Sequence, residues 1–210
     1  KESSMKRVVS TGPKLIVGLM LLLLSGSLFA AKPLPASYVK PGVDLSTYNK
    51  VLIKPLNMDN IEVLKPVWEQ DNDDVWTFEP ENVEAIQEWF MDAMQEEVEK
   101  KGGYPMVSQP DDDVIRVEVE LLSITPYVKP GTPANDGKFK TQTLGSGDVV
   151  VSAEFRDSTT RELLILIEGE RAIGTEYKKL SPENHTANIK GLFAKWGKVI
   201  RNGLDKAHNK

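Results

Sequence analysis

The chain has 210 residues, with 31 Asp and Glu against 26 Lys and Arg and a formal charge of −5. It has no cysteine, which excludes disulfides, thiol catalysis, cysteine-ligated zinc and iron–sulfur clusters. The acidic balance argues against a nucleic-acid partner, because such binding uses Lys and Arg to displace counterions from phosphate.

The N-terminal residues have the order of a secretory signal. A positive region precedes an apolar run, residues 15–24, and small residues follow it. We expect residues 1–31 to be a signal peptide that directs the protein to the periplasm or cell envelope. Retention as a membrane anchor is the alternative, because residues 15–31 reach the lower length limit of a spanning helix. A membrane contact is expected only in that case.

The cleavage position is expected after Ala30, with Ala31 and Ser27 as alternatives. Met5 is the expected natural start, with residues 1–4 as non-native or upstream sequence. Ser27 stands where a lipoprotein signal carries its lipidated cysteine. A serine hydroxyl cannot form that thioether, so we expect no lipid anchor, whether Ser27 is natural or an engineered replacement of cysteine.

An extended lead-in is expected over residues 32–49, because prolines recur in it. Residues 50–210 are expected to form a single domain, beginning with a strand at residues 50–56. A loop with three large aromatic residues and an acidic run follows this strand. These aromatic residues are Trp68, Trp76 and Phe78.

Two amphipathic helices are expected in this domain. Pro80 suits the first turn of a helix over residues 80–101, and Gly102 suits its end. Apolar residues also recur at helical spacing over residues 182–207, with Ser181 as the N-cap.

Alternating strands lie between the two helices, and a shorter strand is expected at residues 104–107. Alternation places apolar residues on one face of each of two strands, at residues 116–121 and 149–155. They are Val117, Val119 and Leu121 in the first strand and Val149, Val151, Ala153 and Phe155 in the second. A turn at residues 157–162 leads to a strand at residues 163–173. The predicted fold is α+β, with a largely antiparallel sheet of about four to five strands and the two helices packed on one face.

No catalytic, cofactor-binding or metal-ligating residue is predicted. Of the two histidines, His185 is expected at the surface near the start of the last helix, and His208 near the frayed C-terminus. The acidic runs lack the ligand spacing of an EF-hand and are expected to be solvated loops. The sequence Gly145–Ser146–Gly147 precedes a strand rather than a helix, which predicts a turn instead of a phosphate-binding loop.

Two loops are candidate partner-binding regions. The first carries Trp68, Trp76 and Phe78, a residue type that anchors interfaces, although Trp76 and Phe78 equally suit a cover over the core. The second is the long connection over residues 126–147, which is rich in proline and glycine. Its candidate contacts are Pro130, Lys138 and Lys140.

Three stretches resemble a known bacterial family. Residues 38–56, 149–164 and 192–206 are similar to the opening, the strand–turn–strand and the closing helix of domain-of-unknown-function family 3313. The resemblance implies an exported domain, commonly a lipoprotein, and brings no catalytic residues with it. The chain departs from the lipoprotein pattern at Ser27.

These observations predict an exported envelope protein of unknown activity, most simply a non-enzymatic binding or assembly component. Its expected partner is another envelope protein. The alternative is a hydrolase of glycan or peptidoglycan that uses two carboxylates, which requires a cleft holding both.

Overall fold

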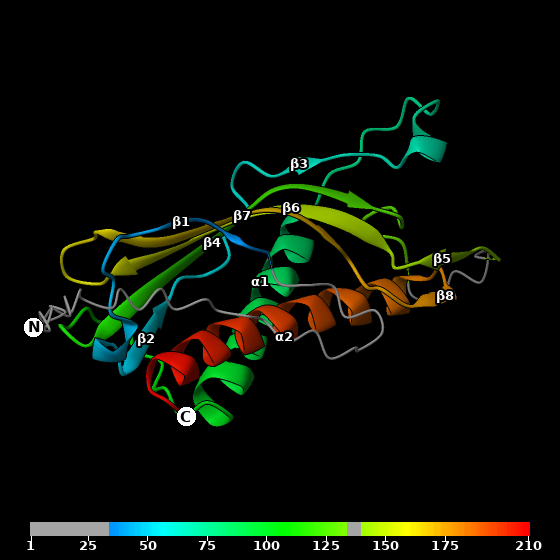
Figure 1. The fold of residues 1–210 in the computed structure, drawn as a ribbon. Coiled ribbons are helices and arrows are strands. Elements are labelled where there is room, and N and C mark those ends of the chain that lie inside the picture. Colours follow the sequence, from blue (N-terminus) through cyan, green and yellow to red (C-terminus); the bar gives the residue numbers. More distant parts are fainter. Residues whose placement is uncertain (1–33, 134–139) are drawn as a thin grey trace, which may run out of the picture. The chain divides into compact units, whose positions relative to one another are not determined.

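A six-stranded mixed sheet with two long helices on one face makes up the fold (Figure 1). The computed structural model describes residues 34–133 and 140–210, all within one unit, residues 31–210. The predicted signal segment with Ser27, Ala30 and Ala31 lies outside the described residues. Lys138 does so as well.

The sheet has the strand order β1-β7-β6-β4-β2, and β3 pairs with the far end of β4. Its pairs are antiparallel except those of β2 and β3 with β4, which are parallel. A separate two-stranded sheet pairs β5 with β8. The strands are β1 (Ala36–Val39), β2 (Lys50–Ile53), β3 (Glu62–Val63), β4 (Val114–Pro126), β5 (Gln142–Leu144), β6 (Gly147–Asp157), β7 (Leu163–Ala172) and β8 (Tyr177–Lys179).

The alternation in β4 and β6 decides which face of the sheet is buried. Val117 pairs with Phe155 and Val119 with Ala153, and these side chains pack toward the helices. The next positions in each strand point to the opposite face, as the period of two requires. Glu118 therefore lies beside Glu154 on the open face.

The helices are α1 (Pro80–Met94), which continues as a π-helical turn at Gln95–Lys100, and α2 (Pro182–Ala207). Ser181 caps α2 by accepting the Asn184 N–H, as predicted. The two helices meet through Phe90 and Phe193, whose ring centroids lie 5.6 Å apart in an edge-to-face contact.

The predicted α+β class is confirmed, with a slightly larger sheet than expected. Ala36–Val39, inside the expected lead-in, forms edge strand β1, and a short 3-10 helix follows at Leu45–Thr47. Residues 104–107 contribute only one bridge, at Met106. The strand expected at residues 50–56 is β2, which ends at Ile53, two residues before a proline that has no N–H to donate.

Candidate functional site

A groove opens between the N-terminal halves of α1 and α2 and the segment that follows β4. Its cavity volume is about 280 Å³. The walls are mainly apolar and aromatic, and a few polar side chains reach into it, the usual composition of a binding pocket. We call it the helix groove, lined by Phe78, Asn82, Ala85, Ile86, Trp89, Val128, Lys129, Pro130, Gly131, Thr132, Pro182, His185, Thr186 and Ile189.

His185 is the titratable group of chief interest in the helix groove. Its Nδ1 lies 3.1 Å from the carbonyl oxygen of Ser146 and 3.0 Å from the Ser146 hydroxyl. A carbonyl oxygen only accepts hydrogen bonds, so Nδ1 carries the proton. Nε2 of the neutral ring is then an acceptor, and no described residue hydrogen-bonds to it.

The Ser146 loop is held in place from several directions. Ser146 is 2% exposed, and its N–H donates to the carbonyl of Ile173 at 2.7 Å. Its hydroxyl accepts from the Asn188 side chain at 3.1 Å. His185 and Asn188 are three residues apart on α2, so both lie on the same helix face and hydrogen-bond to the Ser146 loop. Gly145 needs its left-handed φ of +70° here, and a Cβ would meet the Gly174 carbonyl at 2.5 Å.

Burial lowers the pKa of His185 to about 4, and the hydrogen bond with the Ser146 backbone offsets only part of this effect. The ring is therefore neutral at pH 7. No fully buried side-chain N or O in the described part of the chain lacks a partner, so Nε2 is accessible to solvent, and His185 lines the groove. The helix groove thus presents an apolar wall and one uncharged acceptor.

The structure brings two of the predicted partner-binding residues together. Phe78 and Pro130 both line the helix groove. Trp68 is 57% exposed on a separate 3-10 helix, η2 (Val67–Glu69). Trp76 is buried, with only 6% of its surface exposed, which favours its alternative role as a cover over the core. Lys140 is exposed.

One residue of the helix groove was assigned another role from the sequence. His185 is half-buried and lines the groove, so the expectation of a surface residue is wrong. Trp89 of α1 packs against the core and also lines the groove, with the Lys190 Nζ 4.9 Å from its ring centroid. The spacing of His185 and Asn188 behind the Ser181 cap is the signal that could have found the anchored histidine.

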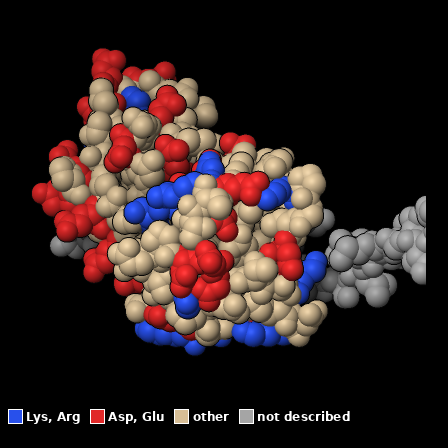
Figure 2. Space-filling model, turned by 90° about the vertical axis from the view of Figure 1, so that its left-hand side faces the viewer, with Lys and Arg blue, Asp and Glu red and all other residues tan. Residues whose placement is uncertain are grey.

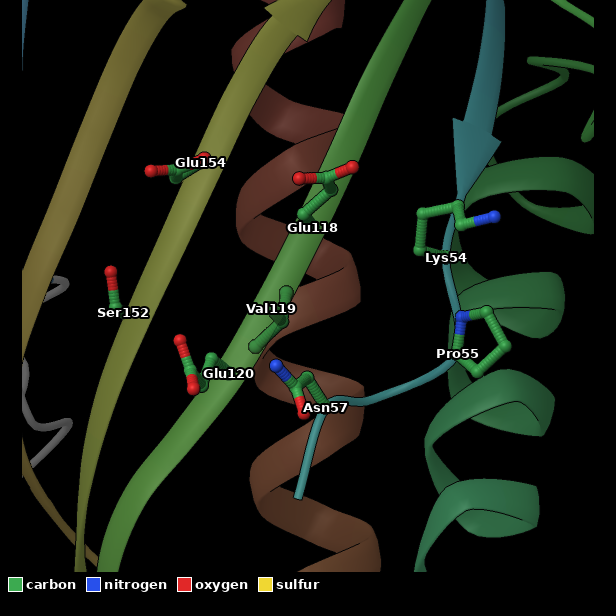
Figure 3. A pocket seen from close by; sticks show the side chains of 8 residues that line it. All are labelled: Lys54, Pro55, Asn57, Glu118, Val119, Glu120, Ser152 and Glu154. Atoms are coloured by element: carbon green, nitrogen blue, oxygen red, sulfur yellow. The ribbon is translucent and has the colours of Figure 1, made fainter. Parts of the chain in front are cut away.

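A second hollow, of about 340 Å³, lies on the open face of the sheet (Figure 3). Three carboxylates surround it, on Glu118 and Glu120 of β4 and Glu154 of β6. Arg116 pairs with Glu118, and the Nε of Arg156 lies 2.8 Å from Glu154. Figure 3 shows the helices behind the sheet, on the side away from these carboxylates. The remaining lining residues are Lys54, Pro55, Asn57, Val119 and Ser152.

The described residues contain no group of three His, Asp or Glu side chains arranged to hold a metal ion. Among residues 34–133 and 140–210, none of the helices combines the length and apolar character that crossing a bilayer requires.

Comparison with curated proteins found no match. Among solved structures, the PelC dodecamer from Paraburkholderia phytofirmans is 13% identical, with a TM-score of 0.33, over 76% of this chain and 92% of that one. Protein XCC0632 from Xanthomonas campestris, of family DUF330, is 9% identical, with a TM-score of 0.44, over 72% and 81%. At these values neither transfers an activity or an assembly to this chain.

The family comparison is decisive for classification. The profile described as "Protein of unknown function (DUF3313)" matches residues 30–200. The match spans the whole sheet and most of α2. It agrees with the resemblance of the three sequence stretches, and the chain belongs to the DUF3313 family.

Proposed function

We propose that this chain is a non-enzymatic binding component of the bacterial cell envelope, exported by residues 1–31. The helix groove receives an apolar segment of another envelope protein. One observation carries the proposal: a neutral His185 acceptor faces a groove with aromatic walls.

The residues and the volume of the helix groove indicate what kind of segment it binds. Phe78, Trp89 and Pro130 offer apolar contact, and burying such surface is worth about 25 cal/mol per Å². His185 Nε2 accepts a hydrogen bond, so the incoming segment carries an N–H or O–H donor. A cavity of about 280 Å³ has room for an aromatic side chain rather than a whole folded element.

Site-specific photo-crosslinking in bacterial cells tests the proposal. A benzophenone amino acid at Thr186, in the groove, is expected to capture one discrete envelope protein upon irradiation. The same probe at Ser152, on the open sheet face, is the control and is expected not to capture that protein.

A groove-filling variant makes the test specific. Ala85→Phe places a ring inside the groove from a half-buried position of α1, and it is expected to abolish the Thr186 crosslink. A far-ultraviolet circular dichroism melt checks that this variant is folded. Absence of a Thr186 product, or its persistence in a folded Ala85→Phe chain, would overturn the proposal.

The carboxylate hydrolase is a second candidate, supported by the cross-strand pair Glu118 and Glu154 in the sheet hollow. Directly opposed side chains have Cβ atoms about 5 Å apart, so their carboxyl groups can reach the separation of about 5 Å that retaining glycosidases use between theirs. Release of soluble fragments from purified peptidoglycan, abolished by Glu118→Gln and by Glu154→Gln, would support it. Equal fragment release by the parent chain and both variants would exclude the hydrolase.

A further inference from the structure

An arm with exposed apolar side chains projects from the sheet between β3 and α1 (Figure 1). We call residues 62–77 the arm. Four of its apolar side chains are unusually open to solvent, which marks interaction surfaces. They are Leu64 at 40% exposure, Val67 at 80%, Trp68 at 57% and Val75 at 80%.

Two contacts hold the first half of the arm in place. Leu64 N–H donates to the Ile124 carbonyl at 2.8 Å, beside the short pairing of β3 with β4. Trp68 packs edge-to-face against Tyr127, with ring centroids 4.9 Å apart. The apolar surface is therefore presented in one arrangement and does not fold back onto the core.

Carboxylates surround this apolar surface. Glu62, Asp71 and Asp73 are exposed, while Asp74 is paired with Lys129 at 3.0 Å. An apolar centre with a charged rim is the usual anatomy of a protein interface. The rim repels an anionic membrane and attracts a basic surface.

The outer side of α2 carries the opposite charge. Lys195, Lys198 and Lys206 are exposed and form no ion pair with another described residue. At 100° per residue, their directions fall within about 80° of one another, so they form one stripe. We call it the lysine face. Gly191 lies in the same sector and leaves open backbone on which a ring can rest.

The arm and the lysine face lie on opposite sides of the described unit. In Figure 1 the helices lie below the sheet and the arm rises above it. Figure 2, which keeps the same vertical axis, shows acidic side chains over the upper part and Lys and Arg along the lower edge. Two different surfaces that are complementary and face opposite ways favour head-to-tail contact over a two-fold dimer.

We propose that the arm of one copy docks on the lysine face of a second copy of this chain. Val67 and Trp68 cover the open backbone of α2 at Gly191, and Asp71 and Asp73 pair with lysines of the lysine face. The residues named in this contact do not line the helix groove, so this assembly and the proposed partner binding can fail independently.

Sedimentation of the protein purified from the envelope of an expressing bacterium tests the assembly. Association is expected at about 0.1 M salt and should weaken at about 1 M, where the screening length falls from about 10 to about 3 Å. A chain that stays monomeric at millimolar concentration in the lower salt would overturn the proposal.

Two charge-reversal variants then identify the surfaces. Asp71→Lys with Asp73→Lys disables the arm, and Lys195→Glu with Lys198→Glu disables the lysine face. Each variant alone is expected to be monomeric. Lys54→Glu with Lys140→Glu removes the same charge from exposed positions elsewhere and is expected to assemble like the parent chain.

Mixing the two disabled variants is the decisive step. In the mixture, the lysines substituted into the arm of one variant are complementary to the glutamates substituted into the lysine face of the other, and the two unchanged surfaces also match each other. A one-to-one mixture is therefore expected to associate, although each variant alone does not. Failure of the mixture to associate, or assembly by either variant alone, would overturn the docking of the arm on the lysine face.

Discussion

His185 Nδ1 lies 3.1 Å from the carbonyl oxygen of Ser146, and this contact determines which ring nitrogen the helix groove presents. Because the carbonyl can only accept, the ring's proton is on Nδ1 and Nε2 is left as an acceptor. A residue 39 positions away in the sequence thus sets the chemistry of the groove.

The His185 contact predicts a pH-dependent stability. The folded-state pKa of His185, about 4, is below its ordinary 6.5 because the ring is buried. Between pH 6.5 and 4, His185 is therefore protonated in the unfolded chain but neutral in the folded chain. The free energy of unfolding is at its full value above pH 6.5 and falls as the pH drops toward 4. The loss is expected to be about 2 to 3 kcal/mol by urea unfolding.

His185→Asn is the matched variant, because it keeps a side-chain donor but does not titrate in this range. It is expected to lose the slope between pH 6.5 and 4. An unchanged slope would show that another group causes the pH dependence.

The hydrogen bonds of Asp157 predict a second pH dependence of stability, at lower pH than that of His185. One carboxylate oxygen accepts the N–H groups of Thr159 at 3.0 Å and Thr160 at 2.8 Å, and the other accepts the Tyr48 hydroxyl at 3.0 Å. Burial by itself would raise the pKa of Asp157, but these hydrogen bonds outweigh it and hold the pKa well below 3.8. Its stabilisation is therefore present above pH 3.8 and is lost as the pH falls further.

Asp157→Asn is expected to lower the unfolding free energy at pH 7 by about 1 to 3 kcal/mol, and this deficit should shrink in strong acid. Asp112→Asn, at an exposed carboxylate, is the control and should change stability by less than about 0.5 kcal/mol. Equal effects of both substitutions would contradict this role for Asp157.

Two glycines of α2 predict opposite responses to the same substitution. A Cβ at Gly191 would meet nothing within 4 Å, so Gly191→Ala should stabilise by about 0.5 to 1 kcal/mol through the higher helix propensity of alanine. A Cβ at Gly197 would lie 2.9 Å from the Glu97 Cβ and 3.2 Å from the Ala93 carbonyl. Gly197→Ala should therefore destabilise by about 1 to 3 kcal/mol through overpacking. Thermal melting of the two variants distinguishes these effects, and two changes of the same sign would contradict the close packing of α1 on α2.

Processing of the N-terminus is predicted by the sequence alone. Expression of the natural gene in a Gram-negative host should yield a mature chain that begins at Ala31, read from its intact mass and N-terminal sequence. The chain should occur in the soluble envelope fraction. An uncut chain in the membrane fraction would instead identify residues 15–31 as an anchor.

Local signals predicted the main elements well. The limits of α2 follow from the Ser181 cap and the repeat of apolar side chains, both of which act within one or two turns. The buried face of β4 follows from alternation, because successive residues of a strand must point to opposite sides. Strand β1 was less apparent, because its four residues are all exposed and lack a buried stripe.

By itself, the sequence determined the α+β class, the two helices, the inward faces of the long strands and the family. These depend on periodicity and capping between near neighbours. Only the tertiary structure decided which distant residues come together: Phe78 and Pro130 in the lining of the helix groove, and His185 with the Ser146 carbonyl. Such contacts arise from packing α1 and α2 on the sheet, and no local pattern encodes which side chains that packing brings together.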